Sequence, residues 1–186
     1  MSIPSHPVVP EILFNSIAMN LITYTERLTL RELIPGDAMH FFSLNADPEV
    51  LRYTGDEPFA SVAAAETFLW NYPDYQRNGF GRWAVLDREA GEFLGWCGLK
   101  RNEEGLVDLG FRFYRKCWGK GYATEAARAS VAYGFEQLGI SEIIGRAAID
   151  NRASIRVLEK VGMKFWKEGR CEGIERAVYY RVKRGE

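Results

Sequence analysis

Two glycines separated by one residue, Gly119 and Gly121, stand between a strand-like and a helix-like segment. A Gly-x-Gly turn lets successive backbone N–H groups point inward, and the following helix start adds the positive end of its dipole, so the turn can hold a phosphate or pyrophosphate. Lys116 and Lys120 could add charge, and Thr124 a hydroxyl group. The same pattern also serves as an ordinary structural turn. Thr124 takes the place of the third glycine of a dinucleotide-binding turn, and the pattern is not a P-loop, so both of those sites are disfavoured.

A second candidate segment begins at Asn151, which is a good helix N-cap. Ile155 and Leu158 follow at helical spacing, and Gly162 supplies a left-handed stop. This structural reading does not require Ser154 in the first helical turn, where serine is a mediocre helix former. Ser154 is therefore a candidate for chemistry.

The elements that must position these residues follow from the hydrophobic periodicity, which changes repeatedly between two and 3.6 from residue 25 onward and indicates an α/β fold. Strands are predicted over residues 25–33, 83–87, 93–100, 106–114, 143–149, 163–167 and 176–183. Helices are predicted after the turn at residues 35–37 and over residues 61–75, 122–138 and 151–161.

Length and charge exclude several classes of function. A chain of 186 residues is long enough for one core, so one domain is expected. The net charge of −1 lacks the electrostatic footprint of a general nucleic-acid binder. No apolar run reaches the roughly 18 residues that span a bilayer, and the N-terminus lacks the features of a secretory signal. No nucleic-acid or membrane partner and a cytoplasmic location are expected.

Metal and triad chemistry are not expected either. Cys97, Cys117 and Cys171 contain no C-x-x-C pair, and His6 and His40 are isolated from other ligand types. Neither a disulfide framework, a zinc site nor a Ser/His/Asp triad is indicated, so the sequence predicts no metal.

The segment 1–23 differs in character from the rest of the chain and is predicted to be an arm, with the domain over 24–186. Pro4, Pro7 and Pro10 disfavour regular structure at its start. Its apolar residues are expected to pack on the domain or on a second subunit, which predicts a homodimer: Ile12, Leu13, Phe14 and Ile17. The alternative is that Met19 is the natural start.

In this order, with one helix and one strand between them, the two segments resemble the GNAT superfamily of acyl-CoA-dependent N-acetyltransferases. Within it they are similar to the branch containing the ribosomal-protein alanine and serine N-acetyltransferases. The resemblance covers the chain from about residue 25 and depends on residues 25–31, 108–111, 118–126 and 151–162. It implies an α/β (α+β) fold with a mixed, mostly antiparallel sheet of six to seven strands and about four helices.

The resemblance implies acetyl-CoA as cosubstrate. The turn would bind its pyrophosphate, mainly through backbone amides, with Lys116, Trp118, Gly119, Lys120, Gly121, Tyr122, Ala123 and Thr124. Phe111, Arg112 and Phe113 would pair with the pantetheine arm, because in this fold their strand splays from the next one. Asn151 would bond the pantetheine amides, and Ser154 would face the thiol.

The implied reaction is direct attack of a primary amine on the thioester in a ternary complex. Ser154 is the candidate donor to the leaving thiolate. Asp108 is the candidate general base, with a surface or turn carboxylate as the alternative reading, and Glu172 and Glu175 are weaker rivals. The cysteines lack a paired histidine, so an acyl-cysteine is not expected.

Other GNAT branches use a glutamate and a tyrosine as base and acid, whereas Arg146 and Leu158 stand at those positions here. That assignment does not transfer. The absence of this glutamate and tyrosine leaves a second interpretation open, a non-catalytic acyl-CoA-binding or sensing domain. A third interpretation is a phosphate-binding α/β protein of another family. The acceptor favoured by resemblance is a protein N-terminal α-amino group; polyamines, amino acids and aminoglycosides are the small-molecule alternatives.

Several aromatic residues are expected near the acceptor side, either as core or as the lining of a pocket for an amphipathic or cationic acceptor. They are Trp83, Trp96, Trp166, Tyr179 and Tyr180.

Overall fold

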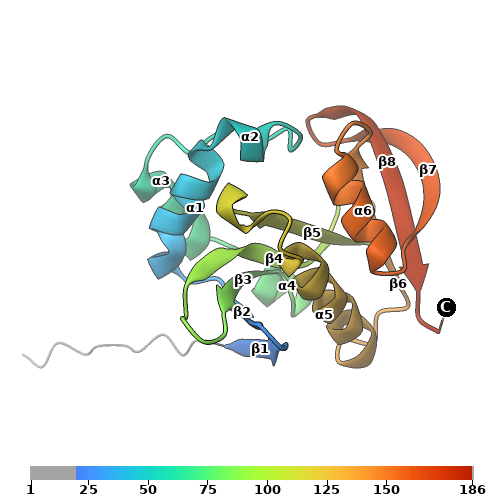
Figure 1. Ribbon diagram of the computed structural model, residues 1–186, viewed down its shortest axis with the longest axis horizontal. Helices are drawn as coiled ribbons and strands as arrows, with labels where there is room; N and C mark the ends of the chain where they lie inside the picture. Colours follow the sequence, from blue (N-terminus) through green and yellow to red (C-terminus); the bar gives the residue numbers. More distant parts are fainter. Residues whose placement is uncertain (1–19, 186) are drawn as a thin grey trace, which may run out of the picture.

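The computed structural model describes residues 20–185 (Figure 1). The apolar residues 12–17 of the expected arm lie outside this range, and the homodimer inferred from them stays a prediction. The sheet begins within the last residues of the segment expected as an arm, since β1 (Leu21–Tyr24) pairs with β2 (Leu28–Glu32).

One mixed sheet runs through the described chain in the order β1-β2-β3-β4-β5-β6-β8-β7. The remaining strands are β3 (Arg82–Asp87), β4 (Phe93–Arg101), β5 (Val107–Phe113), β6 (Glu142–Ala148), β7 (Lys164–Cys171) and β8 (Ile174–Lys183). All neighbours are antiparallel except β5 and β6, which confirms the expected mixed, mostly antiparallel sheet. The sheet has eight strands, more than the six to seven expected, because β1 adds an edge strand.

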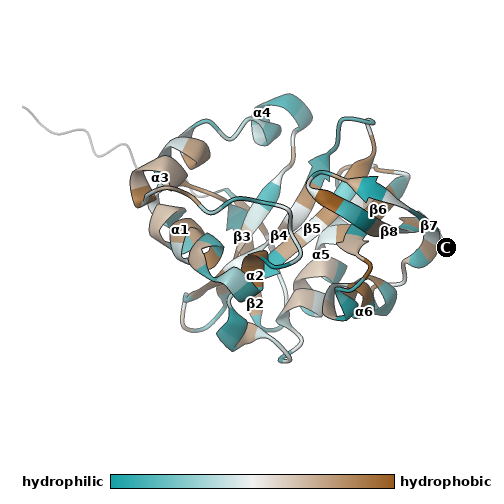
Figure 2. Ribbon diagram, turned by 90° about the horizontal axis from the view of Figure 1, so that it is seen from above, coloured by the Kyte–Doolittle hydropathy of each residue, from teal (hydrophilic) through white to brown (hydrophobic). Residues whose placement is uncertain are grey.

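Helices cover both faces of this sheet (Figure 1). They are α1 (Ala38–Ala46), α2 (Pro48–Leu51), α3 (Val62–Trp70), α4 (Asp74–Asn78), α5 (Tyr122–Glu136) and α6 (Arg152–Lys160), with 3-10 turns at Pro35–Asp37 and Arg115–Cys117. Figure 2 shows α1 and α3 beside β3 and β4, and α6 beside the β6–β8 end. Between Asn20 and Gly185, no helix is both long and apolar enough to cross a membrane.

Alternate residues along a strand contribute to two separate hydrophobic clusters, one on each face of the sheet. In β3, Trp83 and Val85 belong to the main core together with Ala126 of α5, whereas Ala84 packs with Phe41 of α1 in a second cluster. Because successive strand residues point to opposite faces, α5 and α1 lie on opposite sides of the sheet.

The helix predicted over residues 61–75 is wrong at residues 71–73, where the chain is not helical. Ser61 is the N-cap of α3, and its Oγ accepts a hydrogen bond from the Ala64 N–H at 3.1 Å. The helix ends at Trp70, and α4 starts only after Pro73. Proline has no N–H for a helical bond and disfavours helical backbone at the residue before it, which explains the break.

The parallel pair β5 and β6 is short. Only Asp108 with Ile144 and Leu109 with Gly145 are in register, after which β5 leaves β6. From Gly110 onward, β5 is paired only with β4. The expected splay is therefore present, and it opens one backbone edge of β5 to a cavity.

Candidate active site

A cavity of about 730 Å³ lies where β5 separates from β6. One end is formed by the turn before α5 and the start of α6, and the other by β3, β4, the loop after α2 and the β7–β8 turn. The site residues predicted from sequence that line it are Asp108, Phe111, Arg112, Phe113, Trp118, Gly119, Gly121, Tyr122, Ala123, Thr124, Asn151 and Ser154. These predicted site residues, which lie up to 46 residues apart in the chain, thus meet at one place.

The turn before α5 is built to present backbone N–H groups. Gly119 and Gly121 have φ of +74° and +84°, a left-handed conformation that other residues rarely adopt. The first backbone bond of α5 runs from the Glu125 N–H to the Gly121 carbonyl, at 3.0 Å. The amides of residues 119–124 donate to no backbone acceptor in the described chain. These free amides, together with the helix dipole, form an anion site.

Arg27 and Glu125 hold this turn in place, a role that the sequence motifs alone did not reveal. Arg27 donates from Nε to Glu125 at 2.7 Å and from Nη1 to the Lys120 carbonyl at 3.1 Å, and Thr25 donates to the same carboxylate at 2.6 Å. Burial alone would raise the pKa of Glu125, but these hydrogen bonds lower it below its ordinary value. The contacts tie the chain before β2 to the first turn of α5.

Two predicted cofactor residues do not line the cavity. Lys116 is directed to Glu92 in an exposed ion pair. The side chain of Lys120 does not line the cavity, and its carbonyl accepts from Arg27 Nη1. Their side chains therefore add charge near the turn without forming its wall.

The start of α6 places two polar groups at the cavity. Asn151 Oδ1 accepts from the Ser154 N–H at 3.1 Å, which confirms the predicted N-cap. Neither Asn151 Nδ2 nor Ser154 Oγ has a hydrogen-bond partner among residues 20–185. The cap thus uses the amide oxygen and leaves one donor and one hydroxyl available to a bound molecule.

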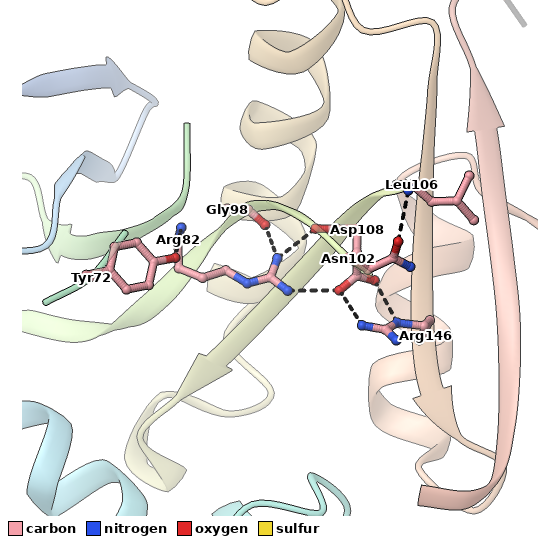
Figure 3. Close-up of polar contacts among 7 residues, drawn as sticks. All are labelled: Tyr72, Arg82, Gly98, Asn102, Leu106, Asp108 and Arg146. Carbon is pink, nitrogen blue, oxygen red and sulfur yellow. Dashed lines mark hydrogen bonds and ion pairs between the residues drawn. The ribbon is translucent and has the colours of Figure 1, made fainter. Parts of the chain in front are cut away.

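Asp108 is 5% exposed and lies between two arginines (Figure 3). Arg82 Nη2 is 2.9 Å from Oδ2, and Arg146 reaches Oδ2 at 3.2 Å and Oδ1 at 3.3 Å. Burial would lower the pKa of Arg146, but the Asp108 charge outweighs it and raises that pKa above its usual value. Since both carboxylate oxygens are engaged, this geometry favours an ion-pair role for Asp108 over the proposed general base. Its weaker rivals are exposed: Glu172 lines the cavity, and Glu175 pairs with Arg170 outside it.

The thiols near the site are poor nucleophiles. Burial raises the pKa of Cys97 to about 12 and also raises the pKa of Cys117 and Cys171 above their ordinary values. Since the thiolate is the reactive form, little of it exists near neutral pH. Cys117 and Cys171 line the cavity without an activating base.

The aromatic residues mostly have a packing role. Trp83, Tyr179 and Tyr180 are buried, and Trp166 packs beside Tyr179. Of the five expected near the acceptor, Trp96 lines the cavity.

Comparison with known proteins agrees with this geometry. Residues 27–164 match the family model of the acetyltransferase (GNAT) domain. The chain is 34% identical over 157 residues to the uncharacterized N-acetyltransferase p20 of Bacillus licheniformis, which covers 83% of this chain and 87% of that one. It is also 34% identical over 159 residues to the FsC-acetyl coenzyme A-N(2)-transacetylase of Aspergillus fumigatus, which covers 75% of this chain and 63% of that protein.

A solved structure shares the fold. The acetyltransferase from Agrobacterium tumefaciens strain C58 superposes with a TM-score of 0.74 at 27% identity, covering 95% of this chain and all of that one. The chain therefore belongs to the GNAT acetyltransferase family. It is an acyl-CoA N-acetyltransferase, which transfers acetyl groups to amines.

Proposed function

We propose that this enzyme transfers the acetyl group of acetyl-CoA to a primary α-amino group, by direct attack while both substrates are bound. The observation that carries the proposal is the meeting of two features in one cavity. The free amides of residues 119–124 suit a pyrophosphate, and the open edge of β5 from Gly110 suits an extended arm of amides. Neither feature alone would define an acyl-CoA site.

The residues present fit acetyl-CoA. The turn offers several N–H donors and the helix dipole to the pyrophosphate, at positions where glycine leaves no side chain in the way. From Gly110 onward β5 has no strand partner on the β6 side, although the Phe113 carbonyl there accepts from Trp118 Nε1 at 2.9 Å, and Asn151 Nδ2 offers a further donor. When bound there, acetyl-CoA supplies the thioester that the amine attacks.

The reaction forms a C–N bond and breaks the C–S bond. The amine lone pair adds to the thioester carbonyl, and an unpaired N–H on the β5 edge can stabilise the resulting oxyanion. Expulsion of the thiolate completes the transfer, and the proton lost by nitrogen balances the one gained by sulfur. Ser154 Oγ is the proposed donor to the thiolate.

An α-amino acceptor suits a site whose candidate base, Asp108, is engaged with two arginines. The reference pKa of an α-amino group is about 8, against about 10.4 for a lysine side chain. At pH 7.5 about a quarter of the α-amine but only about 0.1% of the lysine amine is therefore neutral. The raised pKa values of Cys117 and Cys171 favour direct attack over an acyl-cysteine. A protein N-terminus satisfies both conditions, whereas in a free amino acid the neighbouring carboxylate raises the amine pKa and lowers the neutral fraction.

The test is release of CoA thiol from acetyl-CoA with a panel of amines: Ser- and Ala-starting peptides, amino acids, polyamines and aminoglycosides. The background from the protein's own thiols is measured without amine, and acetyl-CoA binding is measured separately by calorimetry. Turnover of α-amines above lysine-type amines supports the proposal. Binding without turnover of any amine would favour a sensing domain, and failure to bind acetyl-CoA would refute the proposed function.

A further inference from the structure

The acceptor end of the cavity has a floor made by the Arg82–Asp108–Arg146 cluster (Figure 3). Strand pairing places these three side chains on the sheet face opposite α5. Asp108 pairs with Ile144, which lies two residues before Arg146 and therefore points to the same face. Arg82 pairs with Gly98, which in turn pairs with Gly110, two residues after Asp108. Three strands thus contribute one charged residue each to a single surface.

Backbone contacts fix Arg82 in this cluster. Its N–H donates to the Tyr72 hydroxyl at 2.8 Å, and its carbonyl accepts from Tyr75. Its Nη1 donates to the carbonyls of Gly98 at 2.6 Å and Asp108 at 2.8 Å. The guanidinium is therefore held before any ligand arrives, so little ordering entropy is lost on binding.

The buried part of this cavity wall carries excess positive charge. Arg82 and Arg146 share the single carboxylate of Asp108, and Arg112 stands two residues beyond Gly110 on the same face. The side chain of Arg112 is only 9% exposed, whereas its partner Asp56 is 57% exposed. The other carboxylates that line the cavity are also exposed: Glu49 and Glu172. The depth of the pocket is thus cationic, whereas its exposed lining carries both signs, because Arg52, Arg156 and Lys160 lie there as well as these carboxylates.

The unsatisfied polar groups of this wall are donors. A guanidinium has five N–H groups and no acceptor. Arg146 uses Nε and Nη2 on Asp108, and its Nη1 bonds to no described residue. Trp96 Nε1 and Arg112 Nε are buried without a partner, so they add positive dipoles to the same wall. A ligand that supplies acceptor atoms and negative charge is complementary to this surface.

We propose that the acceptor is a small amine that also carries a carboxylate, as an α-amino acid does, and that the cluster binds this carboxylate through Arg146 and Arg82. Asp108 stands two residues from Gly110, roughly 7 Å along the strand, and Gly110 is where the β5 edge opens. A carboxylate bound at the cluster therefore leaves its amine near the point of attack. A polyamine or an aminoglycoside would place positive charge against arginines. This inference rests on the proposed function.

The experiment compares matched amines that differ only at the carboxylate: each amino acid, its carboxamide and its decarboxylated amine. The carboxamide contains more neutral amine at a given pH, because a neighbouring carboxylate raises the amine pKa, so the comparison is biased against the proposal. Losing a charge-assisted contact is expected to lower kcat/KM by roughly tenfold or more for the carboxamide.

Two variants identify the source of the preference. Arg146→Gln should abolish the preference for the carboxylate by raising KM for the amino acid, and Arg146→Lys should retain part of that preference. Acetyl-CoA binding should stay unchanged in both variants. Arg170→Gln is the matched control, because Arg170 is 80% exposed and does not line the cavity. Circular dichroism checks that the variants fold.

The outcomes separate the two proposals. Equal or better turnover of carboxamides, polyamines or C-terminally amidated peptides would overturn the carboxylate inference and leave acetyl transfer intact. Acetyl-CoA binding without turnover of any carboxylate-bearing amine would overturn the inference as well. A similar loss for all three matched amines in Arg146→Gln would reduce Arg146 to a structural role. Failure to bind acetyl-CoA would instead refute the proposed function.

Discussion

Gly110 lies directly beneath the guanidinium of Arg82: a Cβ on Gly110 would stand 2.5 Å from Arg82 Cζ. Real Cβ atoms do not approach other atoms so closely, so the glycine is what allows Arg82 to cross the sheet to Asp108. The same residue marks the point where β5 leaves β6. Gly110 therefore lies both where the edge of β5 opens and against the guanidinium of Arg82 in the acceptor floor.

Gly110→Ala is expected to displace Arg82 from Asp108. Because the contacted atoms are the end of a flexible side chain, Arg82 can move aside, and the loss of its bonds to Asp108 and to the Gly98 carbonyl should cost about 1–3 kcal/mol of unfolding free energy, measured by urea denaturation. Turnover should fall about tenfold or more because the acceptor floor is disturbed. Gly36→Ala is the control, since its added Cβ would meet Ile34 at an ordinary 3.6 Å. Wild-type stability and turnover in Gly110→Ala would contradict the steric argument.

Gly121→Glu should abolish acetyl-CoA binding. It strains a left-handed residue at φ +84° and brings a carboxylate to a site that is meant for phosphate. Gly139→Glu is matched to it, because Gly139 is also left-handed at φ +67°, with nothing within 4 Å of an added Cβ, and does not line the cavity. Calorimetry with acetyl-CoA distinguishes the two variants. Retained affinity in Gly121→Glu would remove the turn from the cofactor site.

The sequence predicted most of the framework that carries this turn. The Gly-x-Gly turn and the Asn151 cap are local features, set by φ preferences and by a side chain bonding to nearby backbone, and both appear in the structure. Most strands follow period-two patterns that neighbouring residues define. Such features need no knowledge of the rest of the chain.

The long-range pairings could not be predicted in this way. Arg82, Asp108 and Arg146 come from β3, β5 and β6, and nothing local in the sequence of any one strand identifies its partners. Residue type alone indicates Asp108 as a candidate base, whereas in the structure its carboxylate is engaged with two arginines. The pairing of Arg27 with Glu125, 98 residues away in the chain, is not predictable from local sequence for the same reason.

Ser154→Ala tests the proposed donor to the leaving thiolate. The hydroxyl has no partner within residues 20–185, and the Asn151 cap uses the backbone N–H, so stability should change by less than about 0.5 kcal/mol. We expect kcat to fall by about tenfold to a hundredfold with little change in acetyl-CoA affinity. Ser141→Ala, at an exposed position outside the cavity, should behave as wild type. An unchanged kcat in Ser154→Ala would exclude Ser154 from the mechanism.

The buried thiol of Cys97 should make the fold sensitive to alkali. Burial raises its pKa in the folded state from about 9 to about 12, so the folded protein holds this proton more tightly than the unfolded chain does. The resulting stabilisation is fully present below about pH 9 and is lost as pH rises from there toward 12. Each pH unit in this window should lower the free energy of unfolding by on the order of 1 kcal/mol.

Urea unfolding of wild type and Cys97→Ala at pH 7.5 and pH 10 isolates this contribution. The packing cost of the substitution is the same at both pH values and cancels in the difference, as do the tyrosines and lysines that both proteins share. We expect the stability gap between wild type and Cys97→Ala to narrow by about 1 kcal/mol at pH 10, because only wild type has this thiol to ionise on unfolding. A gap that stays constant or widens with pH would show that the thiol does not titrate differently in the folded and unfolded states.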